Sequence, residues 1–156
     1  MALENSAGIN VVNHYGPRDT DASKGGQAKS TGQIKRAEWQ FSYDDLPTYG
    51  STNIQFAIPA NATIVSSKWI TGTAWAGGTS LNVGLYTSAG VGVASSGANG
   101  LDAAITPTTA GAVINGDGAL VGAKTIGSEP GELTVAATGT YTAGTATVII
   151  EYHVEV

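Results

Sequence analysis

Cysteine is absent from this chain, which excludes disulfide bonds, thiolate nucleophiles and zinc sites built from cysteine ligands. Histidine is almost as scarce: His14 and His153 are the two in the sequence, and no Gly-x-Ser-x-Gly motif accompanies them. A Ser–His–Asp site therefore has little to be built from. No glycine-rich phosphate loop follows a predicted strand and opens a helix. The sequence predicts a protein that is not an enzyme and that uses no cofactor.

Charged residues are also few, at 12% of the 156 residues, which is about half the usual share. The net charge of −5 has the wrong sign for binding nucleic acid, because neutralising phosphates needs a basic surface. Long apolar runs are missing: residues 148–150 form one of the longest, whereas a bilayer span needs about 20 apolar residues. The first residues lack the basic and then apolar segments of a signal peptide. We therefore expect neither nucleic acid nor a membrane as a partner.

Glycine is abundant, at 22 residues, together with alanine and the β-branched residues threonine, valine and isoleucine. These types favour strands joined by tight turns, whereas charged straight-chain helix formers are scarce. Apolar and polar residues alternate in several segments with the period of a half-buried strand. We expect strands over residues 37–43, 54–58, 63–75, 81–85, 119–121, 133–137 and 144–156. The predicted fold class is all-β, an antiparallel β-sandwich with the jelly roll as one form of it.

Three tryptophans lie in the predicted strands: Trp39, Trp69 and Trp75. Their neighbours two positions away are mostly apolar residues or threonine, which favours packing in the core. The alternative is that the indoles are exposed and stack on sugar rings. Between the strands, residues 101–105 are expected to form one helical turn, which Pro107 ends.

Charge divides the chain at residue 36. Residues 1–36 hold five basic side chains and three acids, a net charge of +2, whereas residues 37–156 hold two basic side chains and nine acids, a net charge of −7. Glycines and Pro17 interrupt any regular element in the first segment. We predict an extended basic N-terminal arm over residues 1–36 and a β-sandwich body over residues 37–156. The arm is either a disordered terminus or a segment that becomes ordered on a partner.

Three motifs contain residue types that bind metals or act in catalysis, but a structural role explains each of them more simply. Glu151, His153 and Glu155 share one face of a strand, but residues i and i+4 lie about 13 Å apart, too far for one ion. Residues 115–118 (Asn-Gly-Asp-Gly) lack the first acid and the closing glutamate of a calcium loop, which favours a tight turn. The adjacent aspartates at 44–45 point to opposite faces of an extended chain, which favours a turn over a glycosidase pair. We expect no metal site.

Four segments resemble virion structural proteins of short-tailed phages, in particular phages of marine and cyanobacterial hosts. The segments are residues 12–18 (Val-Asn-His-Tyr-Gly-Pro-Arg), 43–47 (Tyr-Asp-Asp-Leu-Pro), 58–64 (Ile-Pro-Ala-Asn-Ala-Thr-Ile) and 141–152. The resemblance implies a β-sandwich that decorates or cements the outside of the capsid and is made in the host cytoplasm. It implies the major capsid protein as partner and a homo-oligomer, with a trimer favoured.

The arm would then lie across the capsid surface. Ordering it costs roughly 1–2 kcal/mol per residue, so several apolar anchors or added strand pairing are needed. The candidate docking residues are apolar and basic side chains of the arm together with His14: Ile9, Val11, Val12, His14, Tyr15, Arg18, Lys24, Lys29, Lys35 and Arg36.

Two alternative functions stay open. One is a receptor-binding or glycan-binding head-fibre or tail module that uses Trp69 or Trp75. The other is a glycan hydrolase, for which the chain offers no suitable acid–base pair.

Overall fold

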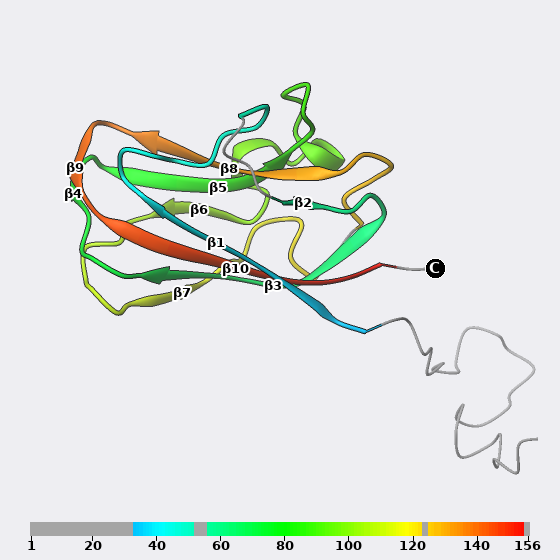
Figure 1. Ribbon diagram of the computed structural model, residues 1–156, viewed down its shortest axis with the longest axis horizontal. Coiled ribbons are helices and arrows are strands. Elements are labelled where there is room, and N and C mark those ends of the chain that lie inside the picture. The colour runs from blue at the N-terminus through cyan, green and yellow to red at the C-terminus, as the bar shows by residue number, and fades with distance from the viewer. Residues whose placement is uncertain (1–32, 52–55, 123–124, 155–156) are drawn as a thin grey trace, which may run out of the picture. The chain divides into compact units, whose positions relative to one another are not determined.

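The computed structural model describes residues 33–51, 56–122 and 125–154, and the regular secondary structure in this part of the chain is almost all strand (Figure 1). The elements apart from strands are two short 3-10 turns, η1 (Val93–Ser95) and η2 (Gly97–Asn99). Within these residues, no helix has the length and apolar character that a membrane span requires. The prediction of an all-β fold is confirmed.

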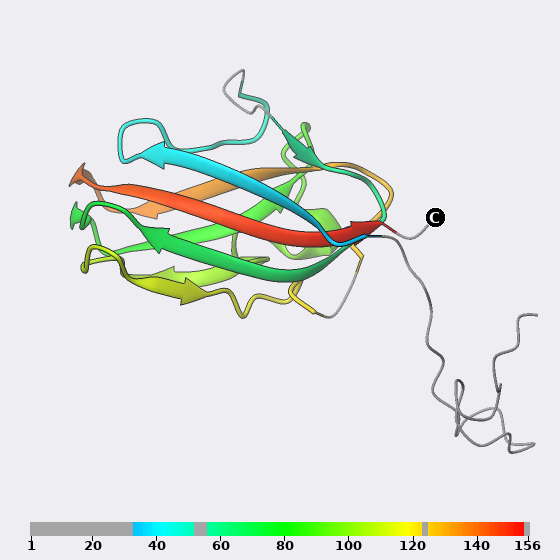
Figure 2. The ribbon, with the colours of Figure 1, turned by 60° about the horizontal axis from the view of Figure 1, so that its bottom comes forward.

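The strands form two four-stranded antiparallel sheets that pack face to face (Figure 2). The first sheet has the order β1 (Lys35–Ser42), β10 (Thr145–Val154), β3 (Ala62–Thr71) and β7 (Val113–Asn115). The second has the order β2 (Ala57–Ile58), β8 (Gly131–Thr138), β5 (Ser80–Tyr86) and β6 (Asp102–Ile105). A separate two-stranded ribbon pairs β4 (Ala76–Gly77) with β9 (Tyr141–Ala143).

The pairing follows one long hairpin folded over on itself. Its outermost pair is β1 with β10, followed by β2 with β8 and β3 with β7, and the tip is β5 with β6. Folding that ribbon into two layers places β10 beside β3 and β8 beside β5. Eight strands connected in this way are a jelly roll. The antiparallel sandwich is therefore confirmed in its jelly-roll form.

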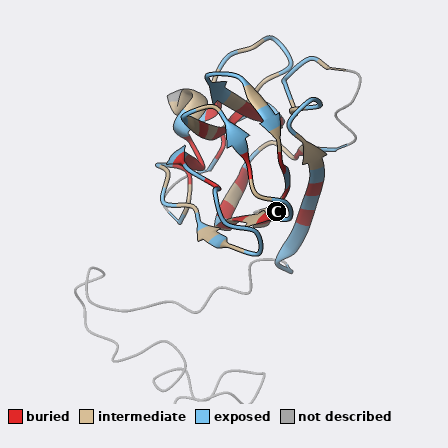
Figure 3. Ribbon diagram, turned by 90° about the vertical axis from the view of Figure 1, so that its left-hand side faces the viewer, coloured by how far each residue is buried: buried red, intermediate tan, exposed pale blue. Residues whose placement is uncertain are grey.

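The core lies between the two sheets, and buried and exposed residues alternate along the strands around it (Figure 3). Trp39, Trp69 and Trp75 are 9%, 2% and 4% exposed, so all three indoles pack in the core as predicted. The Trp69 and Trp75 rings lie 5.6 Å apart, and Phe41 meets the Trp69 ring edge-on at 5.5 Å. The alternative of a sugar platform built on exposed tryptophans is wrong.

Trp75 reaches the core by a route that the alternation did not predict. β3 ends at Thr71 instead of continuing to Trp75, because the chain turns at Gly72, where an added Cβ would lie 2.6 Å from Thr145 Oγ1. The indole N–H of Trp75 then donates to the Thr145 carbonyl at 3.1 Å. A buried indole needs such an acceptor, and the end of β10 supplies it.

Other boundaries also differ from the prediction. Residues 101–105 form no helical turn: Leu101 N–H donates to the Val83 carbonyl at 2.9 Å and the segment continues as β6, because pairing with β5 satisfies its backbone. Residues 119–121 are a turn with a single bridge from Val121 to Ile64, not a strand. The first strand begins at Lys35, two residues before its predicted beginning. Ile54 of the predicted strand 54–58 lies outside the described residues.

Candidate interaction surfaces

The candidate docking residues divide into two groups. Lys35 and Arg36 are the first two residues of β1, and both are exposed. The remaining candidates lie outside the described residues: Ile9, Val11, Val12, His14, Tyr15, Arg18, Lys24 and Lys29. The structure therefore places two of the basic side chains in the sheet instead of on an arm.

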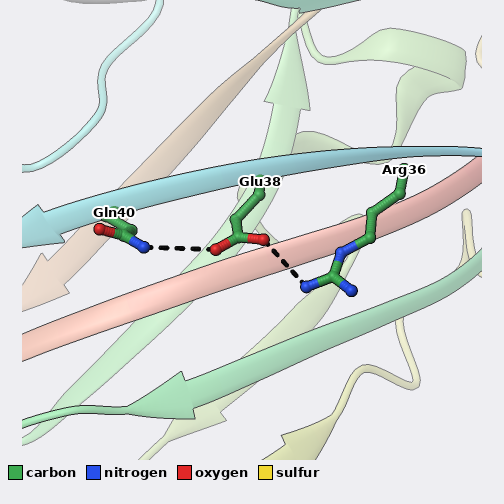
Figure 4. Close-up of polar contacts among 3 residues, drawn as sticks. All are labelled: Arg36, Glu38 and Gln40. Atoms are coloured by element: carbon green, nitrogen blue, oxygen red, sulfur yellow. Dashed lines mark hydrogen bonds and ion pairs between the residues drawn. The ribbon is translucent and has the colours of Figure 1, made fainter.

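The beginning of β1 carries a short chain of polar contacts (Figure 4). Arg36 Nη2 lies 2.9 Å from Glu38 Oε2, and Gln40 Nε2 donates to Glu38 Oε1 at 3.3 Å. The three side chains share one face because they stand two residues apart on a strand. The Arg36 and Glu38 side chains are 57% and 39% exposed, so this ion pair adds less than about 1 kcal/mol to stability. Arg36 is thus available for a partner at little cost to the fold.

The outer face of the first sheet continues this polar surface. Glu151 stands opposite Arg36 in register and accepts a hydrogen bond from Ser66 Oγ at 2.8 Å. Ile149 stands between Glu38 and Lys68 and is only 8% exposed although it points outward, as expected where long polar side chains cover it. Charges of both signs are interspersed, so this face presents no strong field of one sign.

A polar hollow of about 480 Å³ lies where β1 ends and β10 begins. Gln40, Ser42, Asp45, Thr145 and Thr147 supply its polar lining. Amide, hydroxyl and carboxylate groups can hold water or a polar ligand.

The motifs considered for metal or catalytic roles form turns, strands or connections in the residues that the structure describes. Within the residues that the structure describes, no three His, Asp or Glu side chains gather closely enough to hold a metal ion, and Glu155 lies outside those residues. Asp44 accepts a hydrogen bond from the Ser42 hydroxyl, which lowers the pKa of Asp44, in a turn closed by Asp45 N–H and the Ser42 carbonyl. The segment 115–118 ends β7 as an irregular connection instead of a tight turn, since Gly116 and Gly118 donate to β3 and to Leu101.

Asp102 is a buried acid that the sequence did not single out. It is 7% exposed, its Oδ1 accepts the Ala103 N–H at 2.7 Å, and its Oδ2 has no hydrogen-bond partner. Burial raises the pKa of Asp102 by more than the Ala103 N–H lowers it, and Asp117 adds a smaller upward push. The cavity beside it, between the sheets, has no room for a ligand.

Asp102→Asn should therefore stabilise the protein at neutral pH. Because the folded pKa of Asp102 is raised, its contribution to stability is full below the unfolded value near 3.8 and is lost as pH rises through the folded value. We expect the melting temperature of the variant to exceed that of the parent by about 1–3 °C at pH 7. At pH 3.5 the two should melt together. An equal loss at both pH values would mean that the carboxylate is needed for packing.

A second surface, on the opposite sheet, was missed by sequence reasoning. The Tyr49 and Tyr86 rings stack with centroids 5.2 Å apart and planes at 25°, on the outer side of β5 and β8. Tyr49 is 39% exposed, and Val91 beside this pair is 63% exposed. Thirty-six residues separate the two tyrosines in sequence, and Tyr49 lies in a loop, so no strand alternation marks them.

No protein-family model matches the chain, and no curated protein matches it by sequence. Two solved structures share its fold. A chain in the cyanophage Pam1 capsid asymmetric unit matches with a TM-score of 0.50 and 17% identity, covering 99% of this chain and 99% of that chain. A chain in the capsid of Ralstonia phage GP4 matches with a TM-score of 0.54 and 19% identity, covering 83% of this chain and 89% of that chain. At these identities the likeness is one of fold.

Proposed function

We propose that this chain is a non-enzymatic virion protein of a short-tailed phage that decorates or cements the outer surface of the capsid. Its partner is the major capsid protein, and residues 1–36, the last two of which begin β1, supply the main contacts. The observation that carries the proposal is the structural match to the Pam1 chain, which extends over 99% of both chains. Because the match covers 99% of both chains, the Pam1 chain has about the same length as this chain and the same fold.

The distribution of charge supports the same role. The arm carries a net charge of +2 and the remainder −7, so a capsid surface that attracts the arm repels the body. Several arms joined in one oligomer bind a symmetric lattice more tightly than one arm, because the later arms bind intramolecularly. We propose a homo-oligomer for this reason, and a trimer first.

The alternative of a glycan-binding module that uses its tryptophans has lost its basis, since Trp69 and Trp75 are 2% and 4% exposed. A hydrolase has no better support, because Glu151 and His153 lie on an open strand face and Asp44 closes a turn. The two capsid chains that share this fold support a capsid-associated role.

Co-sedimentation with undecorated capsids tests the proposal. Purified full-length protein, mixed with capsids of the phage that encodes it, should pellet with them and saturate at a fixed ratio to the major capsid protein. Binding that fails to saturate, or no binding at micromolar protein, would overturn the proposal.

The double variant Lys35→Ala/Arg36→Ala separates binding from folding at the beginning of β1. Both side chains are exposed, so we expect the melting temperature to change by less than about 3 °C. Capsid binding should weaken by about three- to tenfold, because two docking charges are lost from every copy. The matched control is Lys68→Ala, on the same sheet two strands away, which should bind normally. Equal loss in both variants would point to non-specific charge effects.

A further inference from the structure

We propose that the stacked pair Tyr49 and Tyr86, with Glu132 beside it, is a binding site for a saccharide. The site lies on the outer side of the second sheet, whereas Lys35 and Arg36 lie on the first. The inference therefore does not depend on the proposed capsid contact, and a protein docked through β1 would keep this site accessible.

The loop that carries Tyr49 is fixed to β8 by three hydrogen bonds. Val135 N–H donates to the Pro47 carbonyl at 2.9 Å, Tyr49 N–H to Thr134 Oγ1 at 3.0 Å, and Gly50 N–H to Glu132 Oε2 at 2.7 Å. A loop held in this way loses little conformational entropy when a ligand binds. The Tyr49 ring is therefore held in position before a ligand binds.

The opposite side of the site is equally constrained. Tyr86 ends β5 and stands directly opposite Glu132 in register. The turn that follows Tyr86 is closed by a hydrogen bond from Gly90 N–H to the Thr87 carbonyl at 2.9 Å, and Gly90 approaches Tyr49 so closely that an added Cβ would lie 2.6 Å from the ring. Gly90 also has a φ of +80°, so both its conformation and the space exclude a larger residue. The turn therefore limits the movement of the Tyr49 ring beside Tyr86.

The chemistry of this surface fits a sugar ring. A pyranose stacks the C–H groups of one face on an aromatic ring, and its hydroxyls need acceptors and donors at the margin of that ring. Here the stacked rings carry their own phenol hydroxyls, and Glu132 Oε2 accepts the N–H of Gly50, the residue that follows Tyr49. The site suits a mono- or disaccharide better than a protein. A whole aromatic side chain buries about 150–250 Å², and these two rings, already partly buried, offer less than that each, well short of the roughly 800 Å² per partner of a stable protein interface.

Saturation-transfer difference NMR tests the site with four named probes: maltose, cellobiose, lactose and chitobiose at millimolar concentration. At least one should receive saturation at its ring C–H protons from the full-length protein. Tyr49→Ala should reduce that signal at least tenfold while the circular dichroism spectrum and melting profile stay those of a folded sandwich. Tyr43→Ala is the matched control, since Tyr43 is 38% exposed and lies elsewhere, and it should keep the signal.

Three results would overturn the assignment: no saturation of any probe, equal loss in Tyr43→Ala, or normal saturation in Tyr49→Ala. The same Tyr49→Ala protein should still pellet with capsids. If it does not, and no probe is saturated, the tyrosine pair contacts a protein partner and not a sugar. Failure of the capsid proposal gives a different pattern, in which the parent protein does not pellet whatever its response to the probes.

Discussion

A protein that lacks residues 1–32 should remain folded and should no longer pellet with capsids. Among the residues that the structure describes, those of the buried core run from Ala37 to Tyr152, so we expect the melting temperature of the truncated protein to stay within a few degrees of that of the parent. Capsid binding should weaken by about 100-fold or more, because each copy in the proposed oligomer loses its proposed docking arm. Thermal melting and co-sedimentation on the same preparation measure both effects.

The position of the truncation matters for this experiment. Removing residues 1–36 would also remove Lys35 and Arg36 from β1, where they pair with Tyr152 and Glu151 of β10. A loss of binding could then reflect damage to the sheet. Truncation after residue 32 leaves β1 whole. Retained binding by residues 33–156 would contradict the docking role of the arm and would move the interface to the β-sandwich.

Trp69→Ala should cost about 3–5 kcal/mol of unfolding free energy, a large part of the roughly 5–15 kcal/mol that a domain has. Trp69 is 2% exposed, packs against Phe41 and Trp75, and donates its indole N–H to Thr71 Oγ1 at 3.1 Å. Its removal leaves a cavity between the sheets and an unpaired threonine hydroxyl. Urea unfolding followed by circular dichroism measures the loss.

Val113→Ala is the control for this substitution. Val113 lies on the same sheet, in β7, but is 57% exposed, so the change should cost less than about 0.5 kcal/mol. If Trp69→Ala cost no more than Val113→Ala, the tryptophans would not anchor the core, and exposed indoles would have to be considered again.

The sequence predicted the strands whose side chains differ strongly between the two faces. In β10, Val148, Ile150 and Tyr152 are buried on one face, whereas Thr147, Glu151 and His153 lie on the other, with Ile149 as the apolar exception on that face. This contrast in polarity marks the period of the strand. Leu81, Val83 and Leu85 mark β5 in the same way.

Prediction failed where the chain consists of small residues and its structure depends on distant partners. Residues 101–105 become β6 because β5 is there to pair with them, and the local sequence carries no sign of that neighbour. The end of β3 is set by the approach of Gly72 to Thr145, which stands 73 residues later in the chain. Tyr49 and Tyr86 meet for a similar reason, because β8 holds the Tyr49 loop in place. Only contacts across the fold define these features.

Cryo-electron microscopy of capsids with and without this protein is the most direct test of its role. The proposal predicts additional density on the outer surface of the shell, at symmetry-related positions, into which the jelly roll of residues 33–154 fits with β1 toward the capsid. Density found at the tail alone or on the inner surface of the shell would contradict the proposal. So would the absence of additional density from capsids that carry this protein.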